Sequence, residues 1–173
     1  MSKDELLPLV DENGSVIGSA TRSYCHGGAK PLHPVVHLHV INSRGDIYLQ
    51  KRSPDKDIQP GKWDTAVGGH VDYGEDIVTA LRRESREELG LGDFTPQLIG
   101  RYVFESDVER ELVNSYAAFV NDDAVITPDP LEISEGRFWT VDDLEAALDS
   151  GMMTPNFVLE YRRFHSFFRS ETK

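Results

Sequence analysis

The sequence is poor in cysteine and in long apolar runs. Its 173 residues include one cysteine, Cys25, so no disulfide can form within the chain. A reducing compartment is the default for such a protein, and we expect a cytoplasmic location. No apolar run is long enough to cross a bilayer, and the N-terminal stretch MSKDELLPLVDENG lacks the apolar segment of a signal peptide. We therefore expect no membrane partner.

Positive charge is also scarce. The chain has 18 Lys and Arg against 30 Asp and Glu, which gives a net charge of -12. Such a surface repels nucleic acid at long range, so we expect no nucleic-acid partner. A small phosphorylated ligand can still bind where a metal ion reverses the local sign of charge. The length suits one domain over residues 1–173, and the sequence shows no internal repeat.

The most informative segment runs from 69 to 91 and reads GHVDYGEDIVTALRRESREELGL. Within it, Glu84, Glu87 and Glu88 stand at i, i+3 and i+4, so a helix brings the three carboxylates onto one face. Unpaired carboxylates in this arrangement repel one another. A hard divalent cation such as Mg²⁺, which takes oxygen ligands, removes that repulsion. The alternative is a solvated acidic helix face, and the neighbouring positions favour the metal.

Those neighbouring positions have separate physical roles. Three glycines allow tight turns and close approach of the backbone: Gly68, Gly69 and Gly74. Glu75 precedes the predicted helix, where a carboxylate favours the positive end of the helix dipole. Arg83 is able to hold a glutamate in a fixed rotamer by a bidentate contact. Gly90 follows the last periodic apolar residue, as is typical of a glycine that ends a helix.

Together these positions resemble the Nudix box, in which Gly, Glu and an Arg-Glu-x-x-Glu-Glu-x-Gly run recur at fixed spacing. The matching residues are Gly69, Glu75, Arg83, Glu84, Ser85, Glu87, Glu88, Gly90 and Leu91. Only Ser85 departs from the pattern, as a small residue at an apolar position. The resemblance implies a loop and helix that bind Mg²⁺ or Mn²⁺ and a diphosphate.

The same resemblance implies hydrolysis of a diphosphate bond in a nucleoside diphosphate linked to a further group. The implied metal ligands are three side chains and one backbone carbonyl, those of Glu84, Glu87, Glu88 and Gly68. Glu87, Glu84 and Arg83 form the implied catalytic group, and Glu87 is best suited to accept a proton from the attacking water. The family draws its general base from different places, so four more carboxylates stay open as candidates: Glu109, Glu111, Glu132 and Glu135.

Substrate contacts are less specific in the sequence. Lys51 and Arg52 end a predicted strand before the box and are candidates to meet the outer phosphate, with Gly69 allowing close approach. Equally, both are ordinary basic residues of a hairpin. Trp63 is a candidate to stack on a base, although a structural aromatic is the favoured interpretation. Nothing here selects a base or a sugar. A non-catalytic nucleotide-binding module stays open as an alternative, as does a homodimer.

The expected fold class is α+β, a Nudix-like α/β/α sandwich with a mixed β-sheet. Apolar periodicity and turn residues predict strands at 6–10, 16–18, 35–41, 47–51, 63–67, 98–104, 112–120 and 136–139. Helices are predicted at 77–89, at 144–148 and from 154 to about 168. Within the strand at 35–41, His37 and His39 share one face and are expected to be ordinary surface or half-buried residues.

Outside the box, the chain resembles the Nudix branch related to isopentenyl-diphosphate isomerase, through VDENGSVIGSATR, His33, LQKRSPDKDIQPGKWD and TPNF. That isomerase transfers protons, with a catalytic cysteine in Trp-Thr-Asn-Ser-Val-Cys-Gly-His-Pro. The corresponding run here is WDTAVGGHV, which has Gly68 at the cysteine position. Glycine has no side chain to move a proton, and Cys25 lies far away in the sequence. Isomerisation is therefore the lesser alternative to hydrolysis.

Three histidines also match the isomerase branch, where two histidines seven residues apart and a third after the Cys-Gly pair bind a metal. His26, His33 and His70 have this spacing. The isomerase adds two glutamates in a Glu-x-Glu run, which Glu109-Arg110-Glu111 resembles. The alternative is that these are loop and strand-entry histidines without an ion, and the sequence leaves both open.

Overall fold

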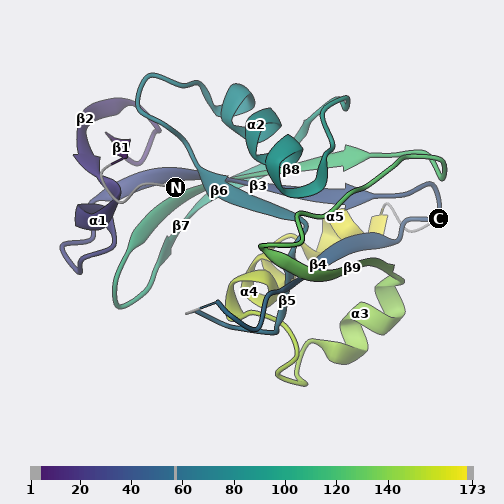
Figure 1. Cartoon of the computed structure of the whole chain (residues 1–173). Coiled ribbons are helices and arrows are strands. Elements are labelled where there is room, and N and C mark those ends of the chain that lie inside the picture. The colour runs from purple at the N-terminus through teal and green to yellow at the C-terminus, as the bar shows by residue number, and fades with distance from the viewer. Residues whose placement is uncertain (1–4, 57, 171–173) are drawn as a thin grey trace.

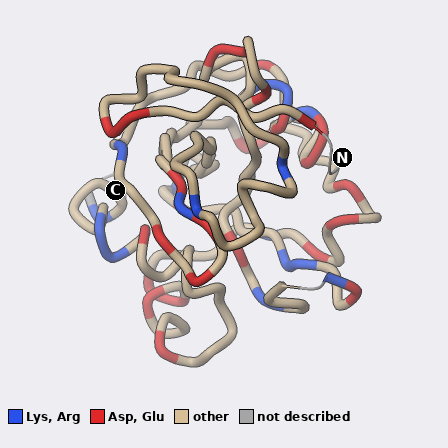
Figure 2. Tube along the Cα trace, turned by 90° about the vertical axis from the view of Figure 1, so that its left-hand side faces the viewer, with Lys and Arg blue, Asp and Glu red and all other residues tan. Residues whose placement is uncertain are grey.

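The computed structural model describes residues 5–56 and 58–170 (Figure 1). The first four residues, Asp57 in the LQKRSPDKDIQPGKWD stretch and the last three residues of the expected domain lie outside the described residues. No helix in the described part is long and apolar enough to cross a membrane. Figure 2 shows acidic residues spread around the trace with basic residues between them, so the net charge of -12 is not confined to one side.

The strands form two sheets. The small one pairs β1 (Leu6–Val10) with β2 (Val16–Thr21) in the expected hairpin. The large one contains β3 (Leu32–Ile41), β4 (Ile47–Arg52), β5 (Trp63–Thr65), β6 (Val67–His70), β7 (Gln97–Glu105), β8 (Arg110–Phe119) and β9 (Ile133–Trp139). Its main order is β5-β4-β3-β8-β7, with β6 paired to β3 and β9 to β4. β3 runs parallel to β8 and the other pairs are antiparallel, which confirms the mixed sheet.

Helices cover both faces of the large sheet (Figure 1). On one side lies α2 (Ile77–Leu89), and on the other lie α3 (Val141–Ala147), α4 (Pro155–Arg163) and α5 (His165–Ser170). Successive side chains of β3 alternate between the two faces. Val36 and Leu38 belong to the core under α2, whereas Ile41 belongs to the core formed with α3, α4 and α5. The predicted α/β/α sandwich is confirmed.

The helix expected from 154 to about 168 is wrong in one respect, because it breaks at Phe164. The backbone of Phe164 has φ −107° and ψ 27°, outside the helical region. Its ring packs edge-on against Tyr102 of β7, with the ring centroids 5.8 Å apart. This contact with the sheet fixes the change of direction between α4 and α5.

Two other segments differ from the sequence-based expectation. The strand at 63–67 is divided at Ala66, because β5 pairs with β4 and β6 pairs with β3. A short helix that was not expected, α1 (Arg22–Cys25), follows β2. It begins after Thr21, whose hydroxyl accepts the backbone N–H of Tyr24 at 3.2 Å.

Candidate functional site

The helix that carries the glutamates, α2, is fixed at both ends. The Asp76 carboxylate accepts the backbone N–H of Thr79 at 2.8 Å and caps the start. Gly90 has φ 64° at the C-cap, in the left-handed region that favours glycine. Ser85, the one departure from the box, is fully buried and donates its hydroxyl to the Leu81 carbonyl at 2.7 Å. Its polar atom is therefore satisfied inside the core.

All three glutamates line one cavity of about 430 Å³, which we call the carboxylate cavity. Glu84 is buried and Glu88 half-buried, whereas the side chain of Glu87 is 58% exposed. Burial raises the pKa of both the Glu84 and the Glu88 carboxyl. Gln50 donates from Nε2 to Glu88 at 2.9 Å. Neighbouring carboxylates that line one cavity and are costly to ionise together fit a divalent cation.

Arg83 ties α2 to the loop that precedes it. Its Nε and Nη2 each donate to Glu75 at 2.9 Å, and its Nη1 donates to Glu84 at 2.7 Å. Nη2 also donates to the backbone carbonyl of His70 at 3.1 Å. The bidentate contact is thus made with Glu75, and a single hydrogen bond orients Glu84. The hydrogen bond to Glu75 raises the pKa of Arg83 further, so the guanidinium stays charged.

The glycines of β6 bring the backbone close to these carboxylates. A Cβ at Gly69 would lie 2.2 Å from the carboxyl carbon of Glu84, so any side chain there displaces the glutamate. At Gly68 the nearest atom to a Cβ would be Cδ2 of His37 at 3.5 Å, an ordinary contact. The close approach predicted for the box glycines is therefore required at Gly69.

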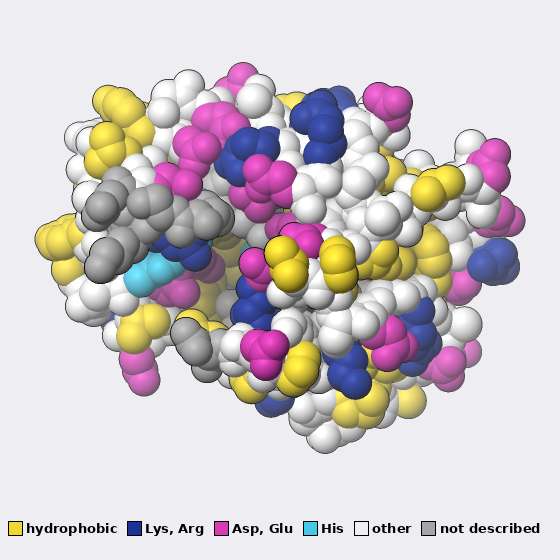
Figure 3. Space-filling model, viewed as in Figure 1, with side chains coloured by type: hydrophobic (Ala, Val, Ile, Leu, Met, Phe, Trp, Pro, Cys, Tyr) yellow, Lys and Arg dark blue, Asp and Glu magenta, His cyan; other side chains and the backbone are white. Residues whose placement is uncertain are grey.

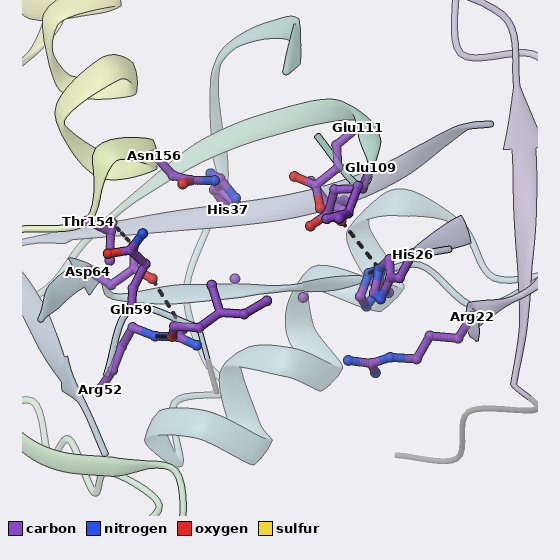
Figure 4. A pocket seen from close by; sticks show the side chains of 16 residues that line it. Arg22, His26, His37, Arg52, Gln59, Asp64, Glu109, Glu111, Thr154 and Asn156 are labelled. Carbon is purple, nitrogen blue, oxygen red and sulfur yellow. Dashed lines mark hydrogen bonds and ion pairs between the residues drawn. The ribbon is translucent and has the colours of Figure 1, made fainter. Parts of the chain in front are cut away.

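A second cavity of about 490 Å³, which we call the histidine cavity, adjoins the first. Both cavities are lined by Arg22, Arg52, Gly68, Gly69 and His70, so they form one cleft. Figure 3 shows acidic and basic side chains around the hollow in the middle of the face that it draws. In Figure 4, Arg22 and Arg52 reach the histidine cavity from opposite sides. Of the two basic residues expected to meet phosphate, Arg52 lines both cavities and Lys51 lines neither.

Four side chains from separate segments meet at one end of the histidine cavity. The ligand atoms of His26, His33, His70 and Glu109 lie within 4.8 Å of one another. His33 lies on β3 and His70 ends β6, while His26 follows α1 and Glu109 immediately precedes β8. The histidine spacing in the sequence therefore corresponds to a cluster able to hold a metal ion.

The hydrogen bonds and charges of this cluster fit a cation. His33 is fully buried and donates from Nδ1 to the Pro31 carbonyl at 3.1 Å, which leaves the Nε2 lone pair free. That Nε2 is buried without a hydrogen-bond partner among the described residues. Burial lowers the pKa of His26 and His33, and it lowers that of His70 to about 3. The imidazoles are therefore neutral, as metal ligands must be, and this N and O donor set suits Zn²⁺ or Mn²⁺.

We expect Zn²⁺ or Mn²⁺ to stabilise the protein through this cluster. A free metal concentration of about 100 times Kd gives about 2.7 kcal/mol of stabilisation. In His70→Gln one ligand is lost, so most of the metal-dependent rise in Tm should disappear at low metal concentration. His165→Gln is the matched control, because His165 lies exposed on α5 and lines neither cavity. Equal rises in the two variants would exclude a metal at the cluster.

The expectation that His37 and His39 are surface or half-buried residues is wrong for His39, which is fully buried. The buried Glu160 of α4 accepts from Nδ1 of His37 at 2.7 Å and from Nε2 of His39. The hydroxyls of Tyr102 and Ser115 donate to the same carboxylate at 2.5 Å and 2.6 Å. Burial opposes charge on His37, but the charge of Glu160 and its hydrogen bond outweigh this and raise the pKa of His37 to about 9.

The remaining candidates divide between the cleft and the core. Trp63 is buried, as the structural interpretation favoured. Glu132 lines the carboxylate cavity, and Glu109 and Glu111 line the histidine cavity. Glu135 lines neither cavity. The carboxylates still open as proton acceptors are thus Glu109, Glu111 and Glu132.

Sequence reasoning missed several residues of the cleft, among them Arg22, Gln50 and Lys56. For Gln50 a signal was present, because the alternation of side chains along a strand places neighbours on opposite faces. Gln50 and Arg52 line the carboxylate cavity, and Lys51 between them lines neither cavity. Arg22 belongs to a helix too short to show an apolar period.

Comparisons with known proteins found one matching family model and several relatives. The NUDIX domain family model matches residues 31–157. Isopentenyl-diphosphate Delta-isomerase 1 of Photorhabdus laumondii is 29% identical over 165 residues, which cover 91% of this chain and 93% of that protein. An uncharacterized Nudix hydrolase of Pseudomonas aeruginosa is 33% identical over 137 residues, or 79% of each chain. The crystal structure of DR0079 from Deinococcus radiodurans is similar with a TM-score of 0.77 and 28% identity, covering 92% of this chain and 98% of that one.

Proposed function

The chain belongs to the NUDIX domain family, and from this premise we propose that it is a divalent-metal-dependent hydrolase. The bond cleaved is the diphosphate bond of a nucleoside diphosphate linked to a further group. The observation that carries the proposal is the convergence of Glu84, Glu87 and Glu88 on a cavity that Arg52 also lines. A cleft of this size suits a small-molecule substrate.

The carboxylates of this cavity are oriented by hydrogen bonds within the protein. Gln50 holds one oxygen of Glu88, and Arg83 holds one oxygen of Glu84. These glutamates, with Glu87, would hold Mg²⁺ or Mn²⁺. When bound, such a cation supplies positive charge against the charge that develops on the phosphate.

The basic residues of the cleft are placed to hold the diphosphate. Arg22 and Arg52 enter from opposite sides (Figure 4), and both line the two cavities. Gly69 lines both cavities as well, and the absence of a side chain there lets phosphate oxygens approach the backbone. Arg52 is itself oriented by donating from Nε to the Ile58 carbonyl at 3.1 Å. A guanidinium forms paired hydrogen bonds with phosphate oxygens. Lys51, which lines neither cavity, has no role in this proposal.

In this proposal Glu87, the most exposed of the three glutamates, accepts the proton of the attacking water. Glu87→Gln removes that acceptor at constant size, and we expect roughly 100-fold lower kcat. Formation of the nucleoside monophosphate and of the phosphate ester of the attached group, from a panel of nucleoside diphosphate derivatives with Mg²⁺ or Mn²⁺, measures the effect. Glu135→Gln, outside both cavities, is the control. Unchanged turnover in Glu87→Gln would overturn its role, and a wild type inactive on the whole panel would favour a binding module.

The isomerase relatives favour a second candidate, proton transfer on isopentenyl diphosphate. Gly68 lines both cavities and has no side chain that could take part in that reaction. The single cysteine, Cys25, is buried in α1 and lines neither cavity. Incubation of the purified protein with isopentenyl diphosphate decides between the candidates. Formation of the allylic isomer would refute the argument from Gly68.

A further inference from the structure

Part of the lining of the histidine cavity, which we call its floor, is polar and has no role in the hydrolysis proposed above. His37, Asp64, Thr154 and Asn156 line it on the side away from His26 (Figure 4). Thr154 donates its hydroxyl to Asp64 at 2.9 Å. Val35, Ile58 and Val108 also line the cavity, but a hydrocarbon group against the four polar side chains would cover them without offering hydrogen bonds, which is costly. The floor therefore suits a polar occupant.

His37 is held with one edge of its ring towards this cavity. Nδ1 is bound to Glu160 in the core, at 2.7 Å. The opposite edge faces Gly68, where a Cβ would lie 3.8 Å from Nε2. Because Gly68 lines the cavity and has no side chain, the Nε2 edge stays open to a ligand, and the His37 side chain is 15% exposed.

We propose that this floor receives the group attached to the substrate diphosphate, that this group is uncharged and bears hydroxyls, as a sugar does, and that His37 binds one of its oxygens through Nε2. The inference rests on the proposed function, because the diphosphate must lie between Arg22 and Arg52 for the attached group to reach the floor.

The hydrogen-bonding capacity of the floor explains the choice of a hydroxyl-bearing group. Glu160 engages Nδ1 of His37, so Nε2 is the ring atom left to share a hydrogen bond with a hydroxyl, which both donates and accepts. Oδ1 of Asp64 already accepts from Thr154 and from the backbone N–H of Thr65, so Oδ2, 3.5 Å from Nη1 of Arg52, is the oxygen left to accept from a ligand. The Asn156 amide is both donor and acceptor. Sugar hydroxyls also donate and accept, so they match this mixed set. Glu160 acts as a positioning residue through His37.

The chain contains a matched control for His37. His39 stands two residues away on β3 and also binds the Glu160 carboxylate. It is fully buried against Phe157 and Phe168, however, and does not line the cavity. His37→Leu and His39→Leu each remove one hydrogen-bond partner of Glu160, so both lower stability, but only the first removes a contact to the ligand.

The test compares the affinity of sugar-bearing and parent nucleotides by calorimetry. UDP-glucose is paired with UDP, and ADP-ribose with ADP, in Glu87→Gln protein with Mg²⁺ so that turnover is slow. We expect the sugar to increase affinity in at least one pair. His37→Leu should reduce that increase about 10-fold, and His39→Leu less than about 2-fold. If His37→Leu does not fold, Glu160→Gln, which keeps both histidines, should reduce the increase in the same direction.

Three results would overturn the inference. The first is that the sugar increases affinity in neither pair, and the second is that the two histidine variants lose this increase equally. The third is that isopentenyl diphosphate binds more tightly than inorganic diphosphate while sugars bring no increase in affinity. Wild-type hydrolysis is measured separately. A sugar gain that depends on His37, without hydrolysis, rejects the proposed function alone. Hydrolysis without dependence on His37 rejects this inference alone.

Discussion

Glu88→Gln is expected to lower metal-dependent kcat about 10³-fold and, at the same time, to raise the Tm of the metal-free protein. The substitution removes an oxygen ligand from the carboxylate cavity, which accounts for the lost activity. It also removes a charge that is costly without a cation, because burial and then the neighbouring Glu84 raise the pKa of Glu88. Activity and stability therefore change in opposite directions.

The pH dependence of this stability gain follows from the direction of the shift. The folded-state pKa of Glu88 lies above its unfolded value, so the penalty is complete above the folded pKa and declines as the pH falls from there to the unfolded value. The difference in Tm between Glu88→Gln and wild type should be large at about pH 8 and vanish towards about pH 4. Excess Mg²⁺ should reverse its sign. Thermal denaturation in EDTA measures the difference, and a variant less stable than wild type at about pH 8 would contradict the assignment.

Gly69→Ala is expected to reduce kcat by about 10³-fold, as though Glu84 itself were removed. The new Cβ would lie 2.2 Å from both Cδ and Oε2 of Glu84, so the carboxylate must leave its place and its contact with Arg83. The end of the glutamate side chain is flexible, so stability should change little. The loss should appear in kcat and in metal affinity.

Gly68→Ala is the matched control on the same strand. Its Cβ would lie 3.5 Å from Cδ2 of His37, an ordinary contact, and its backbone carbonyl is retained. We expect the affinity for Mg²⁺ to stay within about 3-fold of wild type, since the substitution moves no carboxylate. Equal losses in the two alanine variants would show that the position of Glu84 is not what Gly69 protects.

Local signals in the sequence predicted the central helix well. The helix predicted at 77–89 has the same bounds as α2, because its signals, apolar periodicity and the C-cap Gly90, lie within the segment or directly beside it. The break at Phe164 was not predictable in this way, because it depends on a ring contact with Tyr102 of a distant strand. Lys51 was assigned to the cleft because the sequence does not show how its strand pairs in the sheet. Only the fold supplies that register.

The histidines illustrate the same limit. His26, His33 and His70 were found by their resemblance to a family spacing, and the structure brings them together with Glu109. The pairing of His37 with Glu160 has no comparable signal, because the carboxylate comes from α4 near the other end of the chain. Contacts between distant segments are set by packing of the whole domain, which apolar periodicity does not encode.

The parallel pairing of β3 with β8 has a consequence for the order of folding. It joins Leu32 to Arg110 and Ile41 to Phe119, so the chain must close a long loop before these strands meet. Glu109 reaches His33 only through this pairing. A metal ion thus finds its complete ligand set late, after the rate-limiting encounter of distant strands. Metal should accordingly slow unfolding while leaving the rate of refolding nearly unchanged.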